Sequence, residues 1–360
     1  MKKLVYNFAV IASLSVAATA TAQDWQSLGK DISTQSEATV FALAPNGTIY
    51  VANQNPGSGG LLSVRKYEGN KWTNVGKENF SNGPASSLSI VVDASGIPYV
   101  AFKDMKSGDK PFVQKFDGKG WVDVAANGPA EGYGDGMSLG FDKNNMLYVA
   151  LNDQKKGRLS VMKLDGGAWK EVGVPSEASG RYISLKFDKN NTPYIAFADE
   201  NEAKRATLKK FDGSNWVQVG ASTPSVKSAD YITFDFDSNN VPYVGYQDSW
   251  DDGKVIVKKL DKNEWAAIGG PVFKSDDDNV VMALDKNNVP YVAYHNTNSH
   301  KLIAKKFDGT AWVPAAKSEE ASGYSTRISI VSDKANNVLY LGYNDSDNGN
   351  KTGIKKLEIK

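Results

Sequence analysis

The sequence predicts an all-β fold, a seven-bladed β-propeller with four antiparallel strands in each blade. Two periodic markers carry this prediction, because a period of 40–50 residues with short strands is typical of propeller blades. Tryptophan recurs every 47 to 49 residues, at Trp25, Trp72, Trp121, Trp169, Trp216, Trp265 and Trp312. A tyrosine-centred strand pattern recurs in phase seven times, from Ile49-Tyr50-Val51-Ala52 to Leu339-Tyr340-Leu341-Gly342.

Each unit contains four short strand patterns, and the fourth unit illustrates them well. Strand patterns over 182–188 and 193–198 flank Lys189-Asn190-Asn191, and patterns over 206–211 and 216–220 flank Asp212-Gly213. Asn and Gly accept the positive φ that tight turns between antiparallel strands require. No stretch shows a sustained helical period, so the alternating strands and turns favour all-β structure.

The two ends of the chain predict how the ring closes. The segment 353–359 is a third strand that no tryptophan strand follows, and the segment 25–29 is a tryptophan strand that no blade precedes. Pairing the N-terminal strand 25–29 with the C-terminal strand 353–359 completes the seventh blade. This closure avoids the exposed edges that an open array would leave at both ends.

The first 22 residues have the features of a signal peptide. Lys2 and Lys3 precede an apolar run, and Ala20-Thr21-Ala22 supplies small residues for cleavage. We therefore expect an exported protein, periplasmic or extracellular, whose residues 23–360 form a single propeller domain. The apolar run is too short to span a bilayer, and no later segment predicts membrane insertion.

Composition excludes several classes of function. The chain has 42 basic and 41 acidic residues, so no charge excess favours binding to nucleic acid. It contains no cysteine, which excludes thiol catalysis, disulfides and thiolate metal sites. Only two histidines are present. We therefore expect neither a metal site nor a cofactor.

The repeat resembles that of bacterial secreted seven-bladed propeller proteins with a unit of the form D-x-x-G-x-P-Y-V-A-Y…K-F-D-G-x-x-W-x-x-V-G. The match is plainest over 93–102, which reads DASGIPYVAF, and in Lys115-Phe116-Asp117-Gly118 followed by Trp121. The resemblance extends from Trp25 to Lys360. It implies the propeller fold and says little about function, because most such proteins lack an assigned activity.

The repeated residues are interpreted as structural. A buried tryptophan covers roughly 150–250 Å², and each blade needs such a side chain against its neighbour. The Asp-Lys-Asn-Asn turns lack the alternating ligands and the distant Glu of a calcium loop, so Asx-type turns are favoured. The aspartates that follow the second strands are interpreted as loop caps. They are Asp104, Asp153, Asp199, Asp248 and Asp345.

Candidate ligand-binding residues lie on the face formed by the long, variable loops, because function usually resides on variable loops held by a rigid scaffold. Aligned positions at the start of each inner strand predict a rim of acidic, basic and aromatic side chains around the channel mouth. The rim candidates are Asp135, Arg181, Tyr182, Asp230, Tyr231, Asp278 and Arg327. The other reading of these residues is a solvated polar surface.

Two further candidates interrupt the repeat. Trp250 lies outside the tryptophan period among acidic residues, where it either anchors a sugar or protein partner or folds back over its own blade. His295 shares a loop with His300. Two histidines are too few for a metal centre without a third ligand, so solvated side chains are the favoured interpretation.

Three functions are compatible with this rim. The first is a non-enzymatic binding protein for a glycan or another extracellular polymer. The second is a glycoside hydrolase or polysaccharide lyase, with a carboxylate pair from the rim roughly 5–9 Å apart, Arg181 against a uronate and Tyr182 in proton transfer. The third is a scaffold for protein partners at the cell envelope. No Asp-box repeat or nucleophile motif is present, which favours binding over catalysis; the oligomeric state is not predicted.

Overall fold

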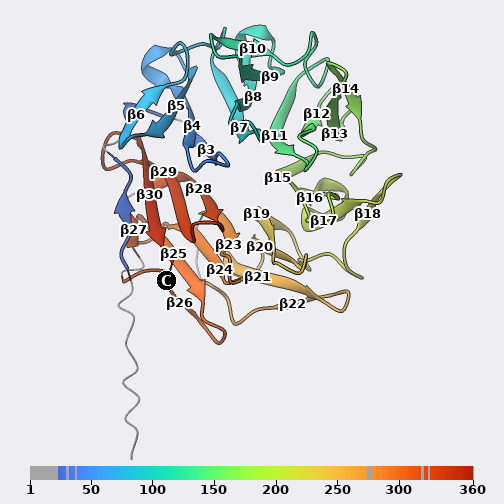
Figure 1. Ribbon diagram of the computed structural model, residues 1–360. Helices are drawn as coiled ribbons and strands as arrows, with labels where there is room; N and C mark the ends of the chain where they lie inside the picture. The colour runs from blue at the N-terminus through green and yellow to red at the C-terminus, as the bar shows by residue number, and fades with distance from the viewer. Residues whose placement is uncertain are drawn as a thin grey trace, which may run out of the picture.

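The computed structural model describes residues 23–29, 32–36, 39–273, 278–317, 320–322 and 325–359. The predicted signal peptide, residues 1–22, lies outside this range. Seven antiparallel sheets stand around a central axis, each with four strands in the blade itself (Figure 1). The prediction of a seven-bladed β-propeller is therefore confirmed.

Blades are numbered in chain order, and each runs from an inner strand to an outer one. Blade one contains β3 (Thr39–Leu43), β4 (Ile49–Asn55), β5 (Leu61–Glu68) and β6 (Lys71–Asn74). Blade two contains β7 (Ala85–Val92), β8 (Pro98–Asp104), β9 (Lys110–Phe116) and β10 (Trp121–Asp123). Blade three contains β11 (Gly134–Phe141), β12 (Leu147–Asp153), β13 (Arg158–Asp165) and β14 (Ala168–Glu171).

Blades four to six repeat this order. Blade four contains β15 (Gly180–Phe187), β16 (Pro193–Asp199), β17 (Arg205–Phe211) and β18 (Trp216–Gln218). Blade five contains β19 (Ala229–Phe236), β20 (Pro242–Asp248), β21 (Lys254–Asp261) and β22 (Glu264–Ala267). Blade six contains β23 (Asp278–Leu284), β24 (Pro290–Asn296), β25 (Lys301–Phe307) and β26 (Trp312–Pro314), with β27 (Glu320–Ser322) added to β25.

Blade seven joins the two ends of the chain. It contains β28 (Ser325–Asp333), β29 (Val338–Asp345), β30 (Lys351–Glu358) and, as its fourth strand, β1 (Gln26–Ser27); β2 (Ile32–Gln35) also pairs with β30. Gln26 pairs with Lys356 and Ser27 with Lys355, both antiparallel. The predicted closure of the ring is therefore confirmed. Three short 3₁₀ helices lie in the loops after second strands: η1 (Pro56–Ser58), η2 (Met105–Ser107) and η3 (Glu200–Glu202).

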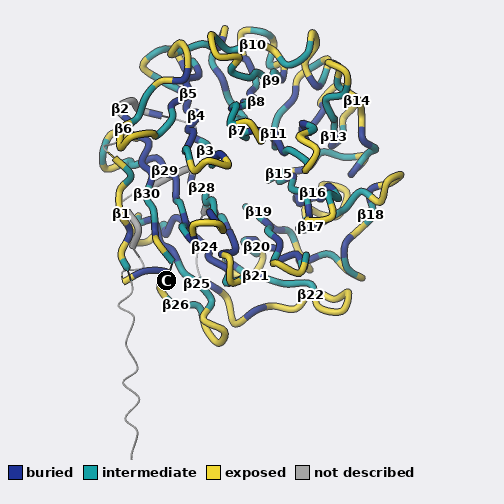
Figure 2. The backbone as a smooth tube through the Cα atoms, viewed as in Figure 1, coloured by how far each residue is buried: buried dark blue, intermediate teal, exposed yellow. Residues whose placement is uncertain are grey.

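The core lies between the blades. Every residue of β16 and of β24 is buried, because neighbouring blades cover both faces of the second strands. A strand buried on both faces requires a continuous apolar run, and the repeated Tyr-Val-Ala pattern supplies it. Figure 2 shows buried stretches along the blades and exposed residues at many of the turn tips.

One end of the ring is held by its short turns. Asp188 in the turn of blade four accepts backbone N–H bonds from Asn190 and Thr192, an Asx-type turn that recurs at Asp93, Asp142, Asp237 and Asp285. The next blade reaches across to each turn: the Asn240 side chain accepts the Lys189 N–H at 3.0 Å, and Asn145, Asn191 and Asn288 make the equivalent bond. The short turns of this face thus make hydrogen bonds that hold adjacent blades together.

The channel is also crossed at that end. The Lys334 ammonium of blade seven donates to the Phe236 carbonyl of blade five at 3.1 Å and lies 3.6 Å from the Asp235 carboxylate. Lys186 of blade four lies 3.6 Å from the same carboxylate. Burial alone would raise the pKa of Asp235, but the two ammonium groups lower it below its ordinary value. The variable loops lie at the opposite end of the channel.

A tryptophan clasp connects most blades at their outer edge. The indole N–H of the outer-strand tryptophan donates to a carbonyl three residues after the tryptophan of the preceding blade. Five tryptophans make this bond, at 2.6–3.3 Å: Trp72, Trp121, Trp216, Trp265 and Trp312. The interpretation of the periodic tryptophans as structural is confirmed at these five interfaces.

Each clasp requires glycine after the carbonyl that accepts the bond. These glycines are Gly29, Gly76, Gly173, Gly220 and Gly269, with φ between 59° and 88°. A Cβ atom there would lie 2.7–3.1 Å from an aromatic side chain of the next blade. The turn therefore needs a residue that tolerates positive φ and has no side chain. This explains why the repeat ends in W-x-x-V-G.

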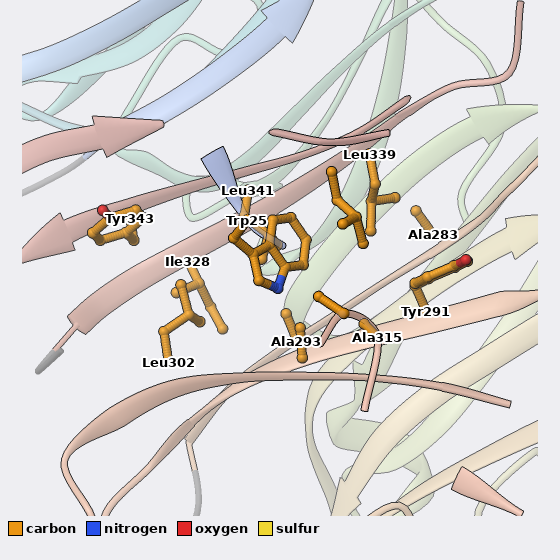
Figure 3. Packing of buried hydrophobic residues seen from close by; sticks show 13 residues of the cluster. Trp25, Ala283, Tyr291, Ala293, Leu302, Ala315, Ile328, Leu339, Leu341 and Tyr343 are labelled. Carbon is orange, nitrogen blue, oxygen red and sulfur yellow. The ribbon is translucent and has the colours of Figure 1, made fainter. Parts of the chain in front are cut away.

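Two interfaces have alanine at this position and lack the clasp. Ala125 holds this position at the interface with Trp169 of blade three, and Ala316 holds it at the interface with Trp25 of blade seven. Neither alanine has positive φ. The Trp169 indole N–H makes no hydrogen bond within the described part of the chain. The Trp25 indole packs among Ala315, Leu339 and Leu341 with its buried N–H unpartnered (Figure 3).

Candidate functional site

Strand register places Asp135, Arg181 and Asp230 at the starts of their inner strands, at the end of the ring that carries the variable loops. Asp135 pairs with Asn152, Arg181 with Ala198, and Asp230 with Gln247. Each pair lies beside the loop between the second and third strands. Immediately afterwards the register shifts in every inner strand from β7 to β28, which marks a bulge. A repeated bulge next to a channel mouth turns side chains out of the regular alternation.

Two tyrosines occupy these bulges with strained backbone. Tyr182 has φ 56° and Tyr231 has φ 50°. The left-handed region is unfavourable for a bulky residue and costs about 1–3 kcal/mol, so it persists only where the surroundings enforce it. Blades two and three place Ser87 and Gly136 at the same position. The two aromatic rings are thus a special feature of blades four and five.

The side chains around these tyrosines form one cluster across the blade boundary. The ring centroids of Tyr182 and Tyr231 lie 5.0 Å apart. The Arg181 guanidinium lies 5.2 Å from the centroid of the Tyr182 ring and approaches its hydroxyl at 3.4 Å. Asp230 hydrogen-bonds to the Tyr182 hydroxyl and accepts a 2.6 Å bond from Ser249 Oγ. These five residues are called the blade 4–5 cluster.

The electrostatics of the cluster keep its phenol neutral. Burial raises the pKa of Tyr182 to about 12, and the Asp230 carboxylate adds to this effect while Arg181 opposes it. At neutral pH the hydroxyl is therefore a hydrogen-bond donor. Together the cluster offers a cation, a carboxylate, hydroxyls and two aromatic rings.

Trp250 lies on the loop that follows the cluster. Its side chain is 71% exposed, so it does not fold back into its own blade. The Lys227 ammonium lies 5.1 Å from the centroid of the indole ring, which is within range of a cation–π contact. The loop itself is fixed, because Asp248 accepts the backbone N–H groups of Trp250 and Asp251.

The predicted loop caps are confirmed at four of the five aspartates. Asp104 accepts the N–H of Ser107, Asp153 that of Lys155, Asp199 that of Asn201, and Asp248 that of Trp250. Their carboxylates thus shape the variable loops. The contacts that hold the loops are local, which leaves exposed side chains such as Trp250 for a ligand.

Asp135 belongs to a separate polar group in blade three. Its carboxylate accepts bonds from the Asn152 amide at 3.0 Å and from the Tyr133 hydroxyl at 3.1 Å. The Lys103 ammonium of blade two lies 4.6 Å from the centroid of the Tyr133 ring. Asp135 and Asp230 come from blades three and five, so each carboxylate has its own set of partners.

The remaining candidates lie in blades six and seven. His295 is 3% exposed in β24 and pairs in register with Asp278, and its ring lies 6.3 Å from that of His300. The interpretation of both histidines as solvated is therefore wrong for His295. Asp278 and Arg327 lie in β23 and β28; their side chains lie outside what the structure describes.

Sequence reasoning missed several members of the mouth. Ser249, Lys227 and Tyr133 contact predicted residues, and Lys103 contacts Tyr133; none of the four carries a periodic signal. Only the strand register and the loop paths bring them there. Among described residues, no group of three or more His, Asp or Glu side chains could hold a metal ion, and no helix is long and apolar enough to cross a membrane.

Comparison with known proteins supports the fold and leaves the function open. No protein-family model and no curated protein sequence matches this chain. Among solved structures, an ulvan lyase of polysaccharide lyase family 25, bound to -[GlcA(1-4)Rha3S]-, is similar over 92% of this chain and 94% of its own, with 11% identity and a TM-score of 0.58.

Two further solved structures are similar. The SapL1 lectin in complex with α-methyl fucoside matches 80% of this chain and 97% of its own, with 16% identity and a TM-score of 0.53. A protein of unknown function from Dyadobacter fermentans matches 94% and 99%, with 12% identity and a TM-score of 0.51. At these identities the likeness concerns the fold alone, so this chain is a seven-bladed propeller with lectins and a lyase among its structural neighbours.

Proposed function

We propose that this chain is an exported, non-enzymatic binding protein that holds a glycan or another extracellular polymer at the variable mouth of the propeller. The blade 4–5 cluster carries the proposal. The positive-φ bulge recurs in other blades, but only blades four and five place aromatic rings on it, beside a carboxylate and a guanidinium. This convergence of side chains supports a ligand site.

The chemistry of the cluster suits sugars. Aromatic rings stack against the C–H faces of a pyranose, while Asp230 accepts and Arg181 donates hydrogen bonds to hydroxyl groups. The exposed indole of Trp250 adds a further stacking surface beside the cluster. Two structural neighbours are described with bound saccharides, which supports this ligand class. An envelope protein partner is the alternative ligand.

A binding screen with matched variants tests the proposal. Residues 23–360 are tested on a glycan array and in polysaccharide pull-downs, together with Asp230→Asn, Trp250→Ala and the control Val122→Ala, an exposed residue on an outer strand. We expect saturable binding that falls at least ~10-fold in the first two variants, the effect of losing about 1.4 kcal/mol. The control should bind normally.

Two outcomes would contradict the proposal. Binding that survives in both rim variants would exclude the mouth as the site. Absence of binding to every glycan would exclude the ligand class and favour a protein partner. Secretion of the full-length chain, with a mature N-terminus at Gln23, tests the predicted signal peptide separately.

Polysaccharide lysis is the second candidate, and one observation favours it. The Tyr182 hydroxyl contacts both the Arg181 guanidinium and the Asp230 carboxylate. In an elimination Arg181 would neutralise the uronate carboxylate, Asp230 would take the C5 proton, and Tyr182 would give its proton to the leaving glycosidic oxygen. The same screen separates the two functions. Shortening of the recovered polymer with a new unsaturated end, lost in Tyr182→Phe, would replace the binding proposal with a lyase.

A further inference from the structure

The interface between blades two and three, which lacks the tryptophan clasp, contains a pocket. Its volume is about 810 Å³, within the range of small-molecule sites. Its lining includes Ala125, Met162 and Trp169, together with residues of the 126–131 connection. Its lining comes from the connection after β10 and from β9, β12, β13 and β14, with the loops beside them, and it shares no residue with the blade 4–5 cluster. Figure 1 shows β14 at the outer edge of the ring.

The exchange of glycine for alanine removes the clasp beside the pocket. Ala125 stands where five interfaces have glycine with positive φ, and it does not adopt that conformation. The chain after β10 therefore takes another path, and the Trp169 indole lines the pocket instead of closing the interface. Its N–H makes no hydrogen bond among the residues that the structure describes.

The charges around the pocket favour an anion. Three lysines and two carboxylates line it: Lys110, Lys155, Lys156, Glu131 and Asp153. Lys155 pairs with Glu131, while Lys156 lies 3.7 Å from Asp153 and 3.1 Å from Glu171. Lys110 is exposed, and its side chain makes no ion pair or hydrogen bond within the described part of the chain. One cation thus remains available to a ligand.

We propose that this pocket is a second ligand site, for an anionic saccharide whose ring stacks on Trp169 and whose carboxylate or sulfate contacts Lys110. The indole supplies an apolar face and a free donor, which suit the C–H face and a hydroxyl of a pyranose. The neighbouring lysine supplies the charge preference. The site is independent of the proposed mouth, because the two are built from different blade boundaries.

Calorimetric titration with defined probes tests the site. The probes are methyl glucuronide, methyl glucoside 6-sulfate, neutral methyl glucoside and inorganic sulfate. Wild-type protein should bind at least one anionic sugar at least ~10-fold more tightly than the neutral sugar or sulfate alone. The two anionic sugars distinguish a carboxylate ligand from a sulfate ester.

Substitutions in the pocket give the decisive comparison. Ala125→Gly restores the glycine of the clasped interfaces and should close the pocket, which weakens binding at least ~10-fold without truncating a polar side chain. Trp169→Ala and Lys110→Ala should weaken it similarly. Lys119→Ala, an exposed lysine of the same blade outside the pocket, should bind like the wild type.

Several results would overturn the proposal. Equal binding by wild type and all three pocket variants would exclude the pocket, and equal affinity for sulfate alone would reduce it to an ion site. Failure of every probe to bind would also exclude it. Asp230→Asn should leave this binding unchanged, so failure here is distinguishable from failure of the proposal for the mouth.

Discussion

The interface between blades three and four and the interface between blades six and seven use their periodic tryptophans differently. Trp216 is 9% exposed and donates its indole N–H to the Val172 carbonyl at 2.6 Å. Trp25 is 8% exposed, yet its indole N–H is buried without a partner. The difference follows from Gly173 in one interface and Ala316 in the other. Burial of the ring and satisfaction of its N–H are therefore separate requirements.

The interface between blades two and three shows a second consequence of the same exchange. There Ala125 also removes the clasp, but the space around Trp169 opens into a pocket instead of packing closed. Between blades six and seven, Ala315 and the residues of β29 fill the equivalent space (Figure 3). Loss of the clasp thus permits a cavity, and the neighbouring side chains decide whether it forms.

The largest effect is expected from breaking a clasp by its glycine. Gly220 has φ 88°, and a Cβ there would lie 2.7 Å from Trp265 Nε1. Gly220→Ala should lower the free energy of unfolding by about 3 kcal/mol, because backbone strain and overpacking add together. Denaturant unfolding measures this difference.

Gly96→Ala is the matched control for Gly220→Ala. Gly96 has φ 83°, but a Cβ there would meet nothing within 4 Å. It should therefore cost only the strain of positive φ, about 1 kcal/mol. Equal losses in the two variants would mean that the clasp contributes nothing beyond backbone conformation.

A smaller effect is expected from removing the indole N–H itself. Trp216→Phe leaves the Val172 carbonyl without its bond, whereas Trp25→Phe removes a donor that is already unpartnered. Both variants lose similar apolar area. Trp216→Phe should therefore lower the free energy of unfolding by about 2 kcal/mol more than Trp25→Phe does. The difference combines the hydrogen bond lost in the first variant with the unpaired buried donor removed in the second. Paired chemical denaturation curves test this; equal losses would contradict it.

Restoring glycine at the interface between blades six and seven should change stability least. Ala316→Gly should allow the Trp25 indole to reach the carbonyl of Ala315, a gain of about 1 kcal/mol that the added freedom of the unfolded chain nearly offsets. The net change in unfolding free energy should stay within about 1 kcal/mol. The bond itself is measured by slowed exchange of the Trp25 indole proton, and unchanged exchange would contradict the role of the glycine.

Much of this architecture is readable from the sequence because its causes are local and repeated. The tryptophan period defined the blades, and the unmatched ends at 25–29 and 353–359 predicted the closure. Even the missing clasps are visible as Ala125 and Ala316 in a pattern that otherwise ends in glycine. Their meaning is not visible, because only the packing shows which carbonyl each indole reaches.

The candidate site was less predictable because its contacts are not local. Alignment of the blades placed Arg181, Tyr182 and Asp230 at the rim, and strand register agrees with that placement. The bulge that forces Tyr182 into positive φ has no signal in composition or spacing. The bond from Ser249 to Asp230 joins an inner strand to a loop 19 residues away, and only the folded chain brings them together.

The interface between blades four and five has the Trp265 clasp at its outer end and the buried phenol of Tyr182 at its inner end, and the last prediction concerns this phenol. Burial and the Asp230 carboxylate raise the pKa of Tyr182 to about 12, above the ordinary value of 10.0. The folded state thus binds this proton more tightly than the unfolded state. Its stabilising contribution is complete below pH 10 and is lost as the pH rises through 12. Tyr182→Phe should therefore leave the pH dependence of unfolding unchanged below pH 10. An ultraviolet difference titration of wild type against Tyr182→Phe should show a phenol titrating near pH 12, and a midpoint near 10 would mean that burial and the Asp230 carboxylate do not raise the pKa of Tyr182.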